Sequence, residues 1–261
     1  MAESMVYSLA IHSYRGGTGK STITANLSAV LAAMGLKVAT VDLDLTSPGL
    51  HMIYGVTSSM LKHTLNDYFY GKANLKDVVI DLTSHLGLSR GKIYFLGSSM
   101  KPEEIAKLLK EGYNDTIFRE ITSELEKLYN VDLVIFDTHP GLTEDTLVSV
   151  LSSDVSILLT RMDRQDITGT YIVSQVLRKF GKVSYAVLNM VPPRFVSVPE
   201  LASEVSKLIG VPVIATIPFY NEVLEHRSHG VFVLKHPRHP FTNRIICLLY
   251  TSDAADELDG V

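Results

Sequence analysis

The chain has 261 residues, of which 46% are hydrophobic and 20% are charged, and this balance excludes an intrinsically disordered protein. The formal net charge of -4 leaves no overall positive field for nucleic acid, so only a local basic patch could bind it. The single cysteine, Cys247, excludes an internal disulfide and a cysteine-only metal or iron–sulfur site within one chain.

The chain begins with the pattern of a βαβ unit. Met5–His12 is a short apolar run rich in β-forming residues, which predicts a buried strand. After a glycine-rich turn, apolar residues recur at helical spacing over Lys20–Met34, and Gly35 is suited to end that helix. Lys37–Leu43 is the next apolar run, so we expect a strand, a helix and a second strand parallel to the first.

Apolar runs and helical patterns alternate along the rest of the chain. The helical patterns include Asp115–Leu128 and Ile167–Phe180. The further predicted strands are Ile93–Leu96, Leu133–Asp137, Val155–Thr160, Val183–Asn189 and Val211–Ile217. Continuous apolar strands that alternate with helices are typical of a parallel sheet covered on both faces. We therefore predict an α/β fold of three layers, with a mostly parallel sheet flanked by helices.

No linker, repeat or low-complexity tract divides the chain, which predicts a single domain over residues 1–245. The segment from Ile246 to Glu257 resembles the translation of a sequencing adapter. We therefore interpret residues 246–261 as a non-native tail and expect that the native chain continued beyond Arg244. A genuine polar C-terminal tail is the alternative.

A glycine-rich segment separates the first predicted strand from the first helix. Its residues are Arg15, Gly16, Gly17, Thr18, Gly19, Lys20, Ser21 and Thr22. Glycines let backbone N–H groups surround a phosphate without Cβ clashes, and the helix start adds a positive dipole end. Lys20 can reach β- and γ-phosphates, and Ser21 can ligate Mg²⁺. The strict form of this P-loop motif has glycine at the position of Tyr14, and a glycine turn that only caps a helix is the alternative.

Acidic residues follow two of the predicted strands. Asp137 ends an apolar run, which is the position of a Walker B carboxylate that holds Mg²⁺ through water. Asp42 and Asp44 end the second predicted strand. Taken singly, an aspartate after a strand is more often a turn or helix cap. Because ligands of parallel sheets lie beyond the carboxyl ends of the strands, we expect all three beside the P-loop. The predicted metal site is Ser21, Asp42 and Asp137.

The segment Arg15–Ser21 resembles the deviant Walker A motif of the MinD/ParA ATPases, which usually reads Lys-Gly-Gly-x-Gly-Lys-[Ser/Thr], and the resemblance covers most of the chain. Asp42-Leu43-Asp44 is similar to the switch I aspartates of that family, and Asp137–Leu142 to its Walker B and switch II segment. The resemblance implies a P-loop NTPase fold, ATP and Mg²⁺ as ligands, and hydrolysis of ATP to ADP and phosphate.

Late in the chain, Asn189 is similar to the asparagine that reads adenine in this family. Pro218 and the segment Val223–Gly230 resemble the part that closes over the base. The choice of ATP over GTP rests on the resemblance, since Met190-Val191 after Asn189 does not continue the Asn-Lys-x-Asp pattern of GTPases.

The resemblance also implies a mechanism in which two subunits bind ATP face to face. Lys20 would neutralise the β- and γ-phosphates of its own subunit, and Arg15 would reach the phosphates of the partner. Asp44 would orient the attacking water, and Thr22 would contact the α-phosphate. Hydrolysis, expected to be slow and stimulated by a partner, would let the dimer separate.

Two positions depart from the family pattern. Arg15 stands where lysine is usual. Arginine keeps the positive charge but carries it on a planar guanidinium group, which suits a role in trans. Pairing of Arg15 with a local carboxylate is the alternative. His139 stands where proline or alanine is common, and whether it contacts the γ-phosphate stays open.

These features favour a MinD-like regulatory ATPase that dimerises with ATP and switches the association of a protein partner or a membrane. We expect a cytoplasmic protein, because no signal-type start or bilayer-spanning run is present, with peripheral contact at the inner face of the membrane. MinD-type proteins make that contact through an amphipathic C-terminal helix, which would be missing from this chain.

Three alternatives remain open. A ParA-like DNA-partitioning ATPase is less favoured because of the net charge, although Lys235, Arg238 and Arg244 form a mild basic cluster. A pseudo-ATPase that binds nucleotide but barely hydrolyses it is compatible with Arg15. A cluster carrier or small-molecule synthetase on the same scaffold has no supporting signature.

The sequence contains two further groups of polar residues, four histidines near the C-terminus and two aspartates at the start of a predicted helix. The histidines at 226, 229, 236 and 239 have no trusted zinc spacing and are expected to be solvated or near the nucleotide. Either Asp163 or Asp166 is expected to cap the helix that follows.

Overall fold

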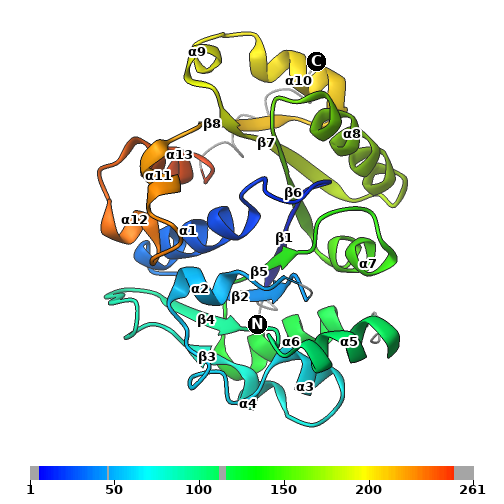
Figure 1. Ribbon diagram of the computed structural model, residues 1–261, viewed down its shortest axis with the longest axis vertical. Coiled ribbons are helices and arrows are strands. Elements are labelled where there is room, and N and C mark those ends of the chain that lie inside the picture. The colour runs from blue at the N-terminus through cyan, green and yellow to red at the C-terminus, as the bar shows by residue number, and fades with distance from the viewer. Residues whose placement is uncertain (1–5, 46, 112–115, 250–261) are drawn as a thin grey trace, which may run out of the picture.

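The computed structural model describes residues 6–45, 47–111 and 116–249. Its strands are β1 (Tyr7–His12), β2 (Lys37–Leu43), β3 (Ile80–Asp81), β4 (Lys92–Leu96), β5 (Leu133–Thr138), β6 (Val155–Thr160), β7 (Val183–Val191) and β8 (Val213–Pro218). Within the described ranges they form one sheet in the order β3-β4-β2-β5-β1-β6-β7-β8 (Figure 1). Every neighbouring pair is parallel except β3 and β4, which are antiparallel.

Helices cover both faces of this sheet. They are α1 (Lys20–Ala33), α2 (Leu50–Tyr54), α3 (Leu65–Phe69), α4 (Leu75–Val78), α5 (Pro102–Glu111), α6 (Ile117–Tyr129), α7 (Glu144–Ser152), α8 (Arg164–Lys179), α9 (Pro193–Val196), α10 (Leu201–Ile209), α11 (Asn221–Glu225), α12 (Phe232–Lys235) and α13 (Pro240–Cys247). One core lies between the sheet and α1, α2, α12 and α13, and two further cores lie under the helices of the opposite face. The predicted three-layer α/β fold is confirmed.

The strands follow the predicted apolar runs, with ends that differ by at most two residues. The short edge strand β3 was not predicted, because two residues carry no detectable period. Strand β7 continues past Asn189 to Val191 through an irregularity, at which Met190 has a left-handed φ of 55°. The predicted elements that begin at Met5 and Asp115 start just outside the described residues.

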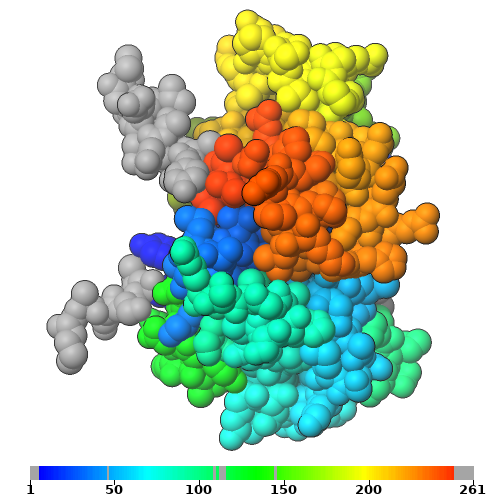
Figure 2. Space-filling model, turned by 90° about the vertical axis from the view of Figure 1, so that its left-hand side faces the viewer, coloured from blue at the N-terminus to red at the C-terminus, as the bar shows by residue number. Residues whose placement is uncertain are grey.

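Helix α1 is buried on most of its surface. Its small side chains at Ala25, Ala29 and Ala32 are fully buried, so the sheet and the C-terminal elements can both approach its backbone closely. Figure 2 shows those C-terminal elements, in orange and red, lying against the blue α1. Gly35 follows the helix with a φ of 110° and donates its N–H to Ala32 O, which confirms its predicted role in ending α1.

The C-terminal part of the described chain packs on the core. The predicted domain boundary after Ile245 falls inside α13, and Leu248 beyond that helix is buried against the same core as α1. Residues 250–261 lie outside the described ranges. The interpretation of residues 246–261 as a non-native tail stays a prediction.

Candidate nucleotide-binding site

The carboxyl ends of β1, β2 and β5 meet at the centre of the sheet. In the register of these strands, Asp137 is the neighbour of Asp42 on one side and of Ile11 on the other. The glycine-rich loop leaves β1 immediately after His12 and leads into α1. The predicted gathering of the aspartates beside the P-loop is therefore confirmed.

The loop has the backbone that a phosphate cradle requires. Gly17 and Gly19 have left-handed φ angles of 75° and 92°, which are strained for residues with a Cβ. Lys20 is buried at the first position of α1, and this burial lowers the pKa of its ammonium group, while the nearby aspartates oppose the shift. The hydroxyl of Thr18 is buried and has no hydrogen-bond partner within the described residues. The left-handed glycines and the buried Thr18 hydroxyl without a partner suit a loop that binds a polyphosphate.

Tyr14 occupies the position that breaks the strict P-loop pattern, and the structure explains how it is accommodated. Gly169 of α8 faces its ring, and a Cβ built on that glycine would lie 1.9 Å from Tyr14 Cδ1. The aromatic ring therefore fits because a residue far away in the sequence has no side chain. Sequence reasoning missed Gly169, since a glycine inside a helix gives no signal of what it faces.

Asp137 is the carboxylate best suited to a divalent cation. It is fully buried, and burial raises its pKa to about 7, while Ser21 and Lys20 act in the opposite direction. Its Oδ1 accepts a long 3.5 Å hydrogen bond from Thr24, and its Oδ2 has no partner within the described residues. A buried acceptor without a donor is costly, so a cation or its water shell would satisfy Oδ2.

Asp42 lies beside Asp137 but is already engaged by the backbone. Its Oδ1 accepts from Asp44 N at 3.2 Å, and its Oδ2 accepts from Gly49 N and Leu50 N at 3.1 Å each. Burial and the charge of Asp137 nevertheless raise its pKa. These bonds show that Asp42 shapes the loop between β2 and α2; its predicted contact with Mg²⁺ stays a prediction.

Asp44 and His139 meet across the ends of β2 and β5. The Nδ1 atom of His139 lies 2.7 Å from Asp44 Oδ1, and the same oxygen accepts a 3.1 Å hydrogen bond from Ser47 N. Both residues were singled out from the sequence, but nothing in the sequence paired them.

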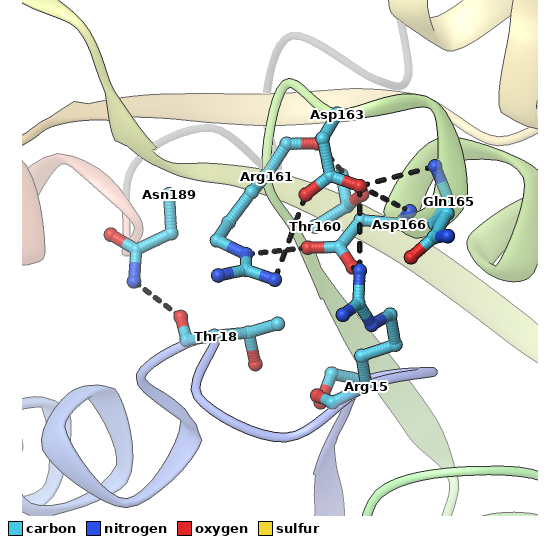
Figure 3. A network of polar contacts seen from close by, with 9 residues as sticks. Arg15, Thr18, Thr160, Arg161, Asp163, Gln165, Asp166 and Asn189 are labelled. Atoms are coloured by element: carbon cyan, nitrogen blue, oxygen red, sulfur yellow. Dashed lines mark hydrogen bonds and ion pairs between the residues drawn. The ribbon is translucent and has the colours of Figure 1, made fainter.

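Arg15 points from the P-loop toward the start of α8 (Figure 3). Its Nη1 atom lies 3.7 Å from Asp163 Oδ1 and 3.7 Å from Asp166 Oδ1. Arg161 holds the same carboxylates, with Nε 2.6 Å from Asp166 Oδ2. Asp163 also accepts from the N–H groups of Gln165 and Asp166, so the predicted helix cap is confirmed. Pairing with local carboxylates, the alternative for Arg15, is thus present in the isolated chain.

A mainly apolar cavity of about 220 Å³ adjoins the P-loop. Its lining includes Gly19, Thr22, Asn189, Pro218 and Leu224, which were predicted singly or within the segment Val223–Gly230, and Phe219, Tyr220 and Phe241, which were not. Asn189 Nδ2 donates a 2.7 Å hydrogen bond to Thr18 O, so the amide also braces the loop (Figure 3). The cavity has the apolar walls and polar rim that suit a planar base.

The C-terminal histidines form an aromatic cluster. The rings of His226, His236 and His239 all lie within 5.3 Å of the Phe232 ring, measured between centroids. Within the part of the chain that the structure describes, no group of three or more histidine, cysteine or acidic residues could hold a metal ion. The zinc alternative has no support there.

The loop, the two buried aspartates and the adjoining cavity define a P-loop nucleotide-binding protein. The model of the AAA domain family AAA_31 matches residues 6–190, and the chain belongs to this family as a P-loop ATPase of the MinD/ParA type.

Known proteins resemble the chain over nearly all of its length. An uncharacterised ATP-binding protein of Methanocaldococcus jannaschii, MJ0547, is 28% identical over 253 residues, which cover 94% of this chain and 87% of the relative. The septum site-determining protein MinD of Pyrococcus horikoshii, solved with Mg-ADP, is 27% identical, with a TM-score of 0.76 and 98% of each chain covered. The MinD of an Aquifex aeolicus MinC:MinD complex is 19% identical, with a TM-score of 0.75, and covers 98% of this chain and 96% of its own. This last match supports the fold alone.

Among the helices of the described ranges, none combines the length and apolar character needed to cross a bilayer.

Proposed function

We propose that the protein is a MinD-like regulatory ATPase that dimerises when it binds Mg-ATP and separates after slow hydrolysis. The observation that carries the proposal is the position of Arg15. Its side chain is 43% exposed at the mouth of the P-loop, and 3.7 Å ion pairs retain it. The pair with Asp163 is exposed and contributes at most about 1 kcal/mol, and the buried Asp166 keeps its pairing with Arg161, so a partner's phosphates can compete for the Arg15 guanidinium.

The remaining site residues take, in this proposal, the roles that the family resemblance implies. The N–H groups of the loop and Lys20 would hold the phosphates, and Thr22 would contact the α-phosphate. Ser21 and Asp137, with Asp42 beside them, would hold Mg²⁺, which when bound neutralises charge on the phosphates. Asp44 would orient the attacking water. Asn189 and Pro218 would contact the base.

The consequence of this cycle would be a switch that other molecules read. The MinD of Aquifex aeolicus was solved in a complex with MinC, and we propose that a regulatory protein likewise recognises the ATP-bound dimer of this chain. A cytoplasmic location with peripheral membrane contact through a C-terminal helix belongs to the same proposal.

Mass in solution tests the proposal, measured without nucleotide, with ADP, and with ATP and Mg²⁺. The wild type should be monomeric in the first two states and dimeric in the third. Asp44→Ala should keep the ATP dimer for longer, because binding groups remain while the attack on phosphate fails. Asp81→Ala, which removes an exposed carboxylate at the edge strand β3, is the matched control and should behave as the wild type.

A different result points to the pseudo-ATPase. A protein that binds ATP but stays monomeric would mean that Arg15 serves its own subunit through Asp163 and Asp166. The dimer proposal would then be wrong.

A further inference from the structure

We propose that His139 is a positioning residue for hydrolysis, which holds the carboxylate of Asp44 in the orientation that the attacking water requires. The inference rests on the proposed function and adds a residue to it. The main evidence is the 2.7 Å contact between His139 Nδ1 and Asp44 Oδ1.

The hydrogen bonding at Asp44 defines the direction of the contact. A carboxylate accepts hydrogen bonds, so Nδ1 of His139 carries the hydrogen and donates it. Ser47 N donates to the same oxygen at 3.1 Å. Two donors on Oδ1, one from the segment after β5 and one from the loop of Asp44 itself, restrict the rotation of the carboxylate about its Cβ–Cγ bond.

The backbone around His139 is anchored, which makes its ring a fixed support. On one side, Thr138 ends β5 and its hydroxyl donates to Ile11 O at 3.0 Å. On the other side, Gly141 N donates to Ser13 O at 3.0 Å. Asp44, in contrast, lies in the loop after β2. The contact with His139 therefore fixes the side chain of Asp44, which lies in a loop, relative to the central strand β5.

The location of the pair favours a role in reaction over a role in stability. The side chains of His139 and Asp44 are 38% and 14% exposed, so neither fills the hydrophobic core. Asp44 lies close enough to Lys20 to affect its pKa, which places the carboxylate at the phosphate end of the site. Preorganising a group that acts on water in the transition state increases kcat without strengthening nucleotide binding.

The test compares kcat and KM for ATP in three variants of His139. His139→Ala should reduce kcat about tenfold, the effect of one charge-assisted hydrogen bond, and leave KM within about twofold. His139→Asn should restore most of the activity, because its amide nitrogen occupies the same place along the side chain as Nδ1. His139→Gln, whose nitrogen matches Nε2 instead, should not restore it.

A double-mutant cycle with Asp44→Ala separates action through Asp44 from an independent effect. In the Asp44→Ala background, His139→Ala should cause no further loss of kcat, because the group it orients is absent. Additive losses would show that His139 acts elsewhere. ATP affinity and the thermal midpoint of the nucleotide-free protein should be unchanged in His139→Ala, which excludes misfolding.

Other outcomes would overturn the role. A rise of kcat in His139→Ala would show that the ring holds Asp44 away from its task, and a rise of KM alone would make His139 a ligand of the nucleotide. Unchanged kinetics in an active protein would refute the role of His139 alone. A wild type without any turnover would refute the proposed function and this role together.

Discussion

The guanidinium of Arg15 lies 3.7 Å from Asp166, whose side chain is almost completely buried at the start of α8. The Oδ1 atom of Asp166 accepts no hydrogen bond within the described residues, so the Arg15 charge compensates a buried oxygen. Arg15 therefore has two competing uses: it neutralises a carboxylate of its own chain, or it reaches the phosphates of a partner.

Weakening this internal pairing should favour the dimer. In Asp163→Ser, a hydroxyl keeps the acceptor that caps α8, but the charge that attracts Arg15 is lost. The ATP-dependent dimer should then form up to about fivefold more tightly, since exposed pairs contribute about 1 kcal/mol or less. Sedimentation across a concentration series measures this change. Weaker dimerisation would mean that Asp163 contacts the partner subunit.

Neutralising Asp137 should raise the stability of the nucleotide-free protein and remove its response to Mg²⁺. Because burial raises the pKa of Asp137 to about 7, its charge at pH 8 is unfavourable in the nucleotide-free protein. Asp137→Asn should raise the free energy of unfolding by about 2 kcal/mol at that pH, yet lose the extra stability that Mg-ATP adds over ATP with EDTA. Thermal unfolding in the two solutions measures both effects.

Asp132→Asn is the matched control for that experiment. Asp132 is exposed just before β5 and accepts from Lys37 N at 2.7 Å, so its variant should keep the full response to Mg²⁺. Equal Mg²⁺ responses in both variants would contradict a metal role for Asp137.

The Tyr14–Gly169 contact predicts strong coupling between the two positions. Gly169→Ala places a Cβ 1.9 Å from the ring of Tyr14 and should destabilise the protein by about 2 kcal/mol, although alanine is the better helix former. In Tyr14→Ala the ring is absent, so the same Gly169→Ala change should stabilise α8 or be neutral. Urea unfolding of the four proteins gives the coupling energy. Additive effects would contradict the contact.

His12 should make stability depend on pH in the mildly acidic range. It is buried, and burial with the nearby Lys20 lowers its pKa to about 3 from 6.5. Its Nδ1 lies 2.7 Å from the Thr138 hydroxyl. Between these pKa values the unfolded chain binds the proton and the folded chain does not. Stability from the neutral ring is therefore complete above pH 6.5 and falls by up to about 1.4 kcal/mol per unit as pH decreases toward 3.

A comparison with His12→Gln isolates this effect. The raised pKa of Asp137 acts in the opposite direction but is common to both proteins. Urea unfolding at pH 8 and pH 5.5 should show that the wild type loses more stability on acidification than His12→Gln. Equal losses would indicate that His12 is protonated in the folded state.

Local features of the molecule followed from the sequence. The run of apolar residues into Gly16–Thr22, and the aspartates that end β2 and β5, were enough to predict a phosphate loop beside carboxylates. Gly35 was predicted at one helix end and either Asp163 or Asp166 at another, and Gly35 and Asp163 are found there. These features could be predicted from the sequence because hydrophobic periodicity, glycine conformation and helix capping depend on only a few neighbouring residues.

The long-range contacts of Tyr14, Arg15 and His139 required the tertiary structure. Tyr14 fits against Gly169, Arg15 pairs with Asp166, and His139 binds Asp44. Each pair joins segments far apart in the sequence, which meet because β5 and β6 flank β1 in the sheet and β2 pairs with β5. The sequence by itself predicted which residues would bind phosphate and metal, since the glycine loop and the aspartates at strand ends are local patterns. The strand order decided which distant residues contact Tyr14, Arg15 and His139. Such contacts could not be predicted, because packing between distant segments produces no periodic pattern in the sequence.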